Sequence, residues 1–207
     1  NLVFRVRERR SFATRAPNPL VPGVRRVLRN REFRLLLTVY LIGALTGAIP
    51  GTLMPYFVTY VLRPEGAALN WISLYLFLYF GTGLVCLPLW VWLANHLGKK
   101  AAWLLSFVSG ATGSLALFFV PEGDVVVFGA ILVWAGSSFG ARLFLGPSIQ
   151  ADVIDYDELL TGKRRESQYG GLWSIMTKFA VIPSLTIPLA VLAAYGYEPN
   201  VVQSDEV

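Results

Sequence analysis

Five of the thirteen acidic residues lie in one stretch, IQADVIDYDELLTGKRRESQYGGLW at 149–173. Asp152, Asp155 and Glu158 follow one another at intervals of three, so on a helix their carboxylates form one acidic ridge. Three basic residues, 163–165, come directly after it. An Asp-x-x-Asp pair can bind a hard cation, which is the chemistry of a membrane-embedded Mg²⁺-dependent transferase. A solvated charged loop, or charges that pair when a protein closes, would use the same residues.

Lys178 is a second candidate, because it lies inside an otherwise apolar segment. A lysine there is costly and functional by default, and a carboxylate is its expected partner. Counted from Tyr169 at about 1.5 Å per residue, Lys178 lies about 14 Å into a membrane helix. A helix that begins later would instead let the amine extend to the membrane interface.

Aromatic and polar side chains share helical faces in two further apolar segments. Two tyrosines do so in 71–97, and a tryptophan, a serine and an arginine are spaced four apart in 125–147. A polar face in lipid must contact protein or water, and aromatic rings beside hydrogen-bonding groups suit a sugar. Interfacial aromatics and helix-to-helix hydrogen bonds are the alternative. The expected substrate path consists of Tyr56, Tyr75, Tyr79, Trp134, Ser138 and Arg142.

Composition identifies the class of protein that holds these residues. The chain is 55% hydrophobic and 15% charged, whereas soluble domains are roughly 25% charged. Its one cysteine, Cys86, allows no intrachain disulfide, and its one histidine, His96, argues against zinc and Ser-His-Asp sites. We therefore predict an integral membrane protein without a cofactor.

Five segments are long and apolar enough to cross a bilayer as helices, which takes about 20 residues each. None shows the alternating polarity of a β-barrel strand. The predicted fold is all-α, with a five-helix transmembrane bundle over 35–194. Its spans are 35–62, 71–97, 101–120, 125–147 and 169–194. The last of these leads into a polar tail at 195–207.

The distribution of lysine and arginine predicts how the bundle is oriented. Residues 1–34 carry ten of the eighteen, the LGKK turn two and the predicted 148–168 loop three, whereas the intervening loops carry only Arg63. Cytoplasmic loops are the basic ones, so these three parts are predicted to be cytoplasmic and the tail extracytoplasmic. Bases next to the first span fit a topology signal or anionic lipid, not nucleic acid. Arg142 lies about five residues from the expected end of its span, within reach of the interface.

Several motifs resemble the melibiose-permease-like glycoside–pentoside–hexuronide:cation symporters, a family of the major facilitator superfamily. The 149–173 stretch resembles the family's signature between the tenth and eleventh helices. WLANHLGKK at 92–100 resembles the superfamily's loop motif, with Asn95 in place of the usual aspartate. NREFRLLL at 30–37 resembles the start of the seventh helix. The five spans then correspond to helices seven to eleven.

This resemblance implies a carboxyl-terminal half whose amino-terminal half and last helix are missing. It implies a multi-pass plasma (inner) membrane transporter, not an enzyme, that moves a small sugar-like solute with Na⁺ or H⁺ by alternating access. Relatives in the same branch carry lysophospholipids instead. Lys178 matches a lysine near the family's cation site. The expected cytoplasmic gate consists of Asn95, Gly98, Lys99, Asp152, Asp155, Glu158 and Arg164.

Overall fold

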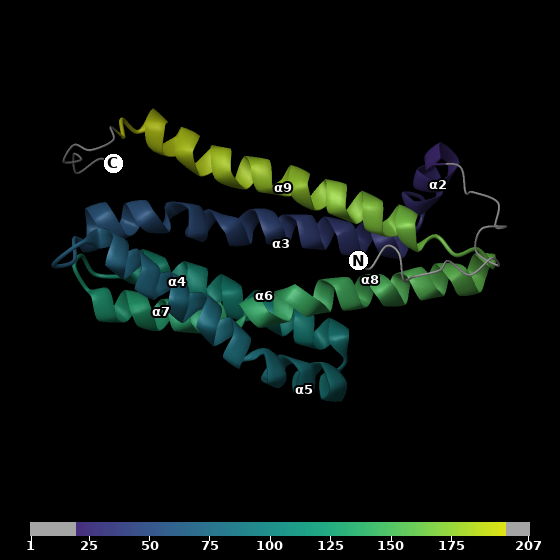
Figure 1. Ribbon diagram of the computed structural model, residues 1–207, viewed down its shortest axis with the longest axis horizontal. Coiled ribbons are helices and arrows are strands. Elements are labelled where there is room, and N and C mark those ends of the chain that lie inside the picture. Colours follow the sequence, from purple (N-terminus) through teal and green to yellow (C-terminus); the bar gives the residue numbers. More distant parts are fainter. Residues whose placement is uncertain (1–19, 198–207) are drawn as a thin grey trace, which may run out of the picture.

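A computed structural model describes residues 20–197, and all regular structure in that range is helical. Long helices run side by side along the molecule, and α5 diverges from the others (Figure 1). Two short elements, η1 and η2, are a π-helical and a 3₁₀ continuation of the helices before them. In chain order the elements are α2 (Leu20–Val27), α3 (Arg31–Tyr56), η1 (Phe57–Leu62), α4 (Ala68–Val85), α5 (Leu87–Leu97), α6 (Lys99–Ala116), η2 (Leu117–Phe119), α7 (Val125–Ser137), α8 (Phe139–Thr161) and α9 (Glu166–Ala194).

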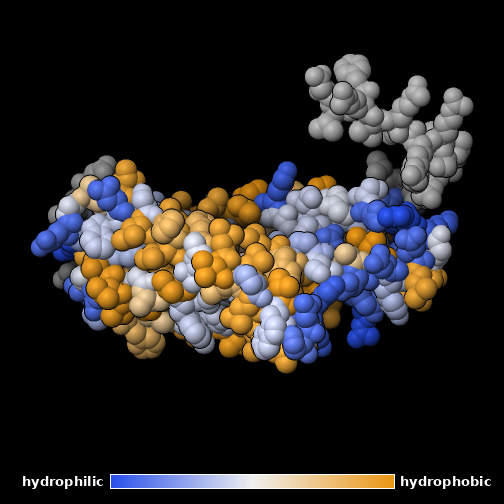
Figure 2. Space-filling model, turned by 60° about the horizontal axis from the view of Figure 1, so that its bottom comes forward, coloured by the Kyte–Doolittle hydropathy of each residue, from blue (hydrophilic) through white to orange (hydrophobic). Residues whose placement is uncertain are grey.

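These helices form five segments long and apolar enough to cross a membrane. The segments are Arg31–Leu62, Ala68–Leu97, Lys99–Phe119, Val125–Thr161 and Glu166–Ala194. Hydrophobic residues cover most of the middle of the face in Figure 2, and hydrophilic residues gather toward its ends. The predicted all-helical membrane fold with five spans is therefore confirmed.

The bundle has two ends. We call the end where α3, α6 and α9 begin the basic end, and the end where α4 and α7 begin the opposite end. Side chains fix two helix starts: Asn30 accepts a hydrogen bond from the Phe33 backbone N–H at 3.1 Å, and Asp124 accepts two from the first turn of α7. At the basic end α5 and α6 are joined by the single residue Gly98.

The prediction of a loop over 148–168 is wrong. Helix α8 continues through Thr161, and only 162–165 separate it from α9. The expected span ended at residue 147 because hydropathy falls there, but a helix that has left the membrane can continue with charged residues. It stops at Gly162, whose φ of 64° suits glycine. The acidic ridge is therefore helical.

Other boundaries differ less. Helices α3, α4, α6 and α9 begin two to four residues earlier than expected, because polar first turns escape a hydropathy criterion. The second span is interrupted at Cys86, beyond which Pro88 lies in the first turn of α5. The fourth is interrupted at Ser138, where the Trp90 indole donates a hydrogen bond to the Ser137 carbonyl at 2.6 Å. Most of 1–34 and of the 195–207 tail lies outside the described residues.

Buried apolar side chains gather in two clusters, one toward each end. The basic-end cluster joins α2, α3, α5, α6, α8 and α9 and includes Phe33, Trp90, Leu145 and Trp173. The opposite-end cluster joins α3, η1, α4 and α7 and includes Tyr75, Phe128 and Leu132. The middle of the bundle lies between them.

Helix α4 crosses α7 and α8 closely in that middle region. A Cβ added to Gly136 would collide with the backbone of Tyr79, and one added to Gly140 with the carbonyl of Gly83. Small residues at such crossings are how membrane helices pack without a hydrophobic driving force. Tyr79 is thereby held against α7 and α8.

Candidate functional site

Two residues of the predicted gate form an ion pair between helices. The Lys99 ammonium at the start of α6 lies 2.7 Å from both carboxylate oxygens of Asp152 in α8. Both side chains are about half exposed, at 40% and 57%. An exposed pair of this kind contributes only about 0–1 kcal/mol to stability. It therefore joins α6 to α8 by a contact that is easily broken.

Gly98 directly precedes Lys99, and Asn95 lies near the end of α5, three residues before Gly98. Gly98 adopts φ 86° and ψ 151°, a backbone conformation that glycine adopts readily and other residues rarely do. It turns the chain from α5 into α6 and so positions Lys99. Asn95 is exposed on α5, and its side chain makes no hydrogen bond within residues 20–197.

Arg164 pairs with a residue that the prediction left out. Its Nη2 atom lies 2.6 Å from Oε1 of Glu166, the first residue of α9. This hydrogen bond and the charge of Glu166 raise the pKa of Arg164, and the charges of Glu158 and Asp155 raise it further. Within the described chain, neither Asp155 nor Glu158 forms an ion pair within 4 Å. They act on Arg164 from a greater distance.

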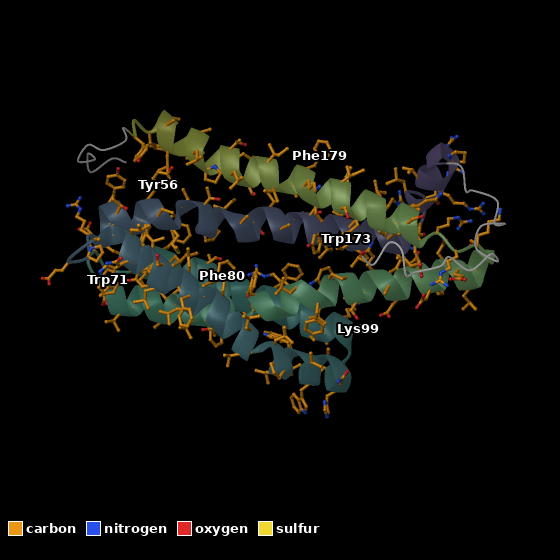
Figure 3. All side chains as sticks on the ribbon, in the orientation of Figure 1. Tyr56, Trp71, Phe80, Lys99, Trp173 and Phe179 are labelled. Carbon is orange, nitrogen blue, oxygen red and sulfur yellow. The ribbon has the colours of Figure 1, made fainter. Side chains whose placement is uncertain are left out.

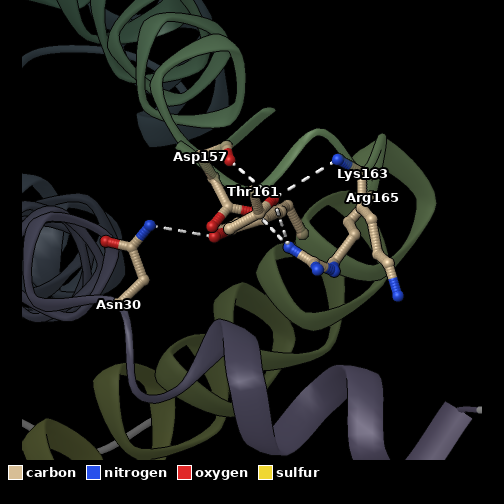
Figure 4. Close-up of polar contacts among 6 residues, drawn as sticks. Asn30, Asp157, Thr161, Lys163 and Arg165 are labelled. Carbon is tan, nitrogen blue, oxygen red and sulfur yellow. Dashed lines mark hydrogen bonds and ion pairs between the residues drawn. The ribbon is translucent and has the colours of Figure 1, made fainter. Parts of the chain in front are cut away.

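The best-buried charges are Asp157 and Arg165, which sequence reasoning did not place in the site (Figure 4). Arg165 Nη1 donates to an Asp157 carboxylate oxygen at 2.7 Å and to the Thr161 hydroxyl at 3.0 Å. The Asp157 and Arg165 side chains are only 12% and 5% exposed, respectively. A signal was present, because Asp157 is five residues past Asp152 and so about 140° around the helix from it. It could therefore face inward while the acidic ridge faces outward.

A separate hydrogen bond joins the starts of α3 and α9. The Asn30 amide donates to the Tyr169 hydroxyl at 2.9 Å, while its side-chain oxygen caps the start of α3. The rings of Tyr169 and Phe33 meet edge to face with centroids 4.8 Å apart. The start of α3, the end of α8 and the start of α9 are thus held together.

Two residues of the predicted substrate path meet in the middle of the bundle. Arg142 in α8 donates from Nη2 to the Tyr79 hydroxyl in α4 at 2.7 Å. Arg142 is half-buried, and its Nη1 atom lies beside Gly47 of α3. A Cβ at Gly47 would lie 2.7 Å from that nitrogen.

Of the other predicted path residues, Tyr75 and Trp134 make no side-chain hydrogen bond with this pair, whereas the Ser138 carbonyl accepts the Arg142 backbone N–H at 3.4 Å. Tyr75 is buried in the opposite-end cluster, where its hydroxyl donates to the Val125 carbonyl at 3.0 Å. Ser138 is buried and bonds the Ala135 carbonyl. Trp134 is 56% exposed and donates to Thr112 of α6. Because the helix is interrupted at Ser138, the expected stripe does not form one continuous surface.

Tyr56 lies at the opposite end of the bundle. Its ring meets that of Tyr197 edge to face at 5.3 Å. A hydrogen bond with Tyr60 raises the pKa of Tyr197 to about 12. Tyr56 therefore belongs to a tyrosine cluster separate from Arg142.

Lys178 is exposed on α9 and forms no ion pair or hydrogen bond with any residue from 20 to 197. Its neighbour Phe179 is 62% exposed and lies on the side of α9 away from α3, whereas Trp173 packs on Tyr40 of α3 (Figure 3). The carboxylate expected beside Lys178 is therefore not found among residues 20–197.

Nothing in the described chain resembles a metal centre. No group of three His, Cys, Asp or Glu side chains lies close enough within residues 20–197 to hold a metal ion. Asp152, one half of the Asp-x-x-Asp pair, is bound to Lys99. Its oxygens are therefore shared with an ammonium group.

Five membrane-length helices with ion pairs at one end define a polytopic membrane protein. The chain belongs to the family described as MFS/sugar transport protein, which matches residues 2–207. The predicted membership of the melibiose-permease-like branch is confirmed. The family consists of transporters, so the protein is not an enzyme and the transferase alternative is wrong.

Similar proteins are named as symporters or carriers. An uncharacterized symporter of Synechocystis is 28% identical over 90% of this chain and 35% of its own length. The glucuronide carrier protein homolog of Escherichia coli is 31% identical over 58% of this chain and 26% of its own. The human sodium-dependent lysophosphatidylcholine symporter 1 is 28% identical over 95% and 36%.

The chain spans about a third of the length of these relatives. No solved structure matches it significantly.

Proposed function

We propose that this chain is part of a secondary active transporter that moves a sugar or glycoside together with Na⁺ or H⁺. Family membership supports transport, and the matched relatives are named as symporters or as a glucuronide carrier. The chain would contribute helices seven to eleven, and the amino-terminal half would come from sequence beyond it. The two halves would rock about a central solute site.

The Lys99–Asp152 ion pair is the observation that best supports an alternating-access mechanism. It joins two helices at the basic end through half-exposed groups, so water can replace each partner at little cost. We propose that the basic end faces the cytoplasm of a plasma (inner) membrane, as its excess of lysine and arginine favours. The pair would form as that side closes and break as it opens.

Lys178 is the residue proposed to couple transport to a cation. It lies in an apolar helix, and none of the described carboxylates pairs with it. A carboxylate of the amino-terminal half would be its counter-charge, and a cation bound at that carboxylate would compete with the lysine. Sodium-dependent relatives favour Na⁺ over H⁺ as that cation.

A lysophospholipid is the second candidate substrate. Its support is the match to the human lysophosphatidylcholine symporter, which extends over 95% of this chain. A sugar and a lysolipid differ enough that one panel separates them.

The test is uptake by the full-length protein reconstituted into liposomes. A labelled glycoside and labelled lysophosphatidylcholine are each supplied with an inward Na⁺ gradient, an inward H⁺ gradient, or neither. We expect one gradient to drive accumulation of one solute above its external concentration. Equal uptake under all three conditions would show a facilitator and refute symport.

A further inference from the structure

Arg142 lies in the middle of the bundle, not near an end. Its guanidinium lies beside Gly47, the midpoint of the Arg31–Leu62 segment, and approaches Gly110, midway along the Lys99–Phe119 segment. The expectation that Arg142 lies about five residues from the end of its span is wrong, because Asp152, which pairs with Lys99 at the basic end, lies ten residues further along α8. The basic end is therefore too far for the side chain to reach by extending along its helix.

The surroundings of Arg142 do not neutralise its charge. Its one side-chain hydrogen bond within residues 20–197 goes to the Tyr79 hydroxyl, a neutral acceptor. A guanidinium has five N–H donors, so most remain available for another acceptor. The described acidic residues lie toward the two ends of the bundle, not in its middle: Glu32, Glu65, Glu122, Asp124, Asp152, Asp155, Asp157, Glu158 and Glu166.

The Arg142–Tyr79 pair forms a polar layer between the two apolar clusters. Ala141 belongs to the basic-end cluster, and the Tyr79 ring packs against the opposite-end cluster. Phe80 and Phe139 contact the Tyr79 ring at 5.3 and 5.7 Å and hold it in place. Gly47 and Gly110 carry no side-chain acceptor, and the Ser138 hydroxyl near Gly110 donates to the Ala135 carbonyl and makes no hydrogen bond to the guanidinium.

We propose that Arg142 binds an oxyanion carried by the transported solute, with Tyr79 as a positioning residue. The planar guanidinium fork matches a carboxylate or a phosphate with two parallel hydrogen bonds, and a membrane interior strengthens such a contact. The inference rests on the proposed transport function and narrows its substrate class to solutes with an anionic group. That group is either the carboxylate of an acidic sugar or the phosphate of a lipid headgroup.

Two matched pairs of probes distinguish these sources. 4-Nitrophenyl β-glucuronide and 4-nitrophenyl β-glucoside differ by one carboxylate, and lysophosphatidylcholine and monoacylglycerol by the phosphocholine group. Equilibrium binding to the full-length protein in nanodiscs is measured without any ion gradient. Wild type is expected to prefer the member that carries the carboxylate or phosphate in one pair, and the pair that shows the preference identifies the source.

The decisive variant is Arg142→Gln, which removes the charge. We expect it to weaken binding of the probe that carries the oxyanion by roughly 10- to 100-fold, the effect of losing a charge-assisted bidentate contact. Binding of the neutral partner should change by less than about threefold. Arg142→Lys keeps the charge but loses the fork, so its loss should be intermediate. Arg34→Gln, the same change at an exposed arginine of α3, is the matched control and should bind like wild type.

Two results would overturn the proposal. One is a wild-type protein that binds both members of each pair equally. The other is an Arg142→Gln or Arg142→Lys protein that unfolds at the wild-type temperature and keeps the wild-type preference. If Arg142→Gln does not fold, the Arg142→Lys protein decides the question alone. Because binding needs no gradient, a failure of symport and a failure of this site give different results.

Discussion

The basic end and the middle of the bundle differ in whether their basic residues have a carboxylate partner. At the basic end Lys99, Arg164 and Arg165 each lie within 2.7 Å of a carboxylate. In the apolar part of the described spans, Arg142 and Lys178 have no carboxylate partner.

This difference distinguishes structural charges from functional ones. The buried Asp157–Arg165 pair is complete within the chain, so it can hold α8 and α9 together in every state. The exposed Lys99–Asp152 pair is complete but weak, so it suits a contact that forms and breaks. Arg142 and Lys178 have no counter-charge among residues 20–197, and a charge within the membrane needs a partner. We infer that the solute or the other half of the protein supplies one.

The largest expected effect comes from breaking the buried pair. Asp157→Asn leaves the Arg165 guanidinium buried without a counter-charge, which should destabilise the protein by about 3–5 kcal/mol. Thermal unfolding of the detergent-purified protein measures this. Asp155→Asn, a matched change on the exposed face of α8, should have little effect. Equal melting of the two variants would contradict the structural role assigned to Asp157.

Replacing Lys178 by alanine should alter coupling. If Lys178 acts electrostatically on the cation site, apparent cation affinity should change by about tenfold, in the range typical of site-to-site coupling. The affinity for solute should change less. Cation titrations of solute uptake measure both, and Lys100→Ala at the exposed start of α6 is the control. A change in solute affinity alone would remove Lys178 from the coupling role.

The smallest change in stability is expected at the exposed pair. Asp152→Asn should destabilise the protein by less than about 1 kcal/mol yet reduce coupled uptake, because the inward-closed state loses its contact with Lys99. Exchanging the two residues, Lys99→Asp with Asp152→Lys, should restore part of the uptake. Unchanged transport kinetics in the single variant would refute the gate.

Sequence reasoning found the spans because an uncharged apolar run of about 20 residues is rarely anything but a membrane helix. It misjudged their ends, because hydropathy measures the apolar part of a helix and α8 continues as a charged helix. Ending the fourth span at residue 147 also placed Arg142 too near the interface, since Asp152, which pairs with Lys99 at the basic end, lies five residues further on. The sequence predicted that Lys99 and Asp152 belong to one gate but not that they form an ion pair, since pairing across 53 positions depends on tertiary packing. Asp157 was passed over because the three-residue spacing directed attention to the opposite face.

The interruption at Ser138 makes α8 a lever arm. Asp152 lies about 21 Å beyond Ser138 at 1.5 Å per residue, so pivoting α8 by about 10° would sweep the carboxylate through almost 4 Å. That travel exceeds the 2.7 Å separation from Lys99. Arg142, only one turn from the pivot, would barely move. The same tilt that separates Lys99 from Asp152 at the basic end would therefore leave the Arg142 guanidinium in place. The pivot at Ser138 and the anion site proposed at Arg142 would lie at the same level of the bundle.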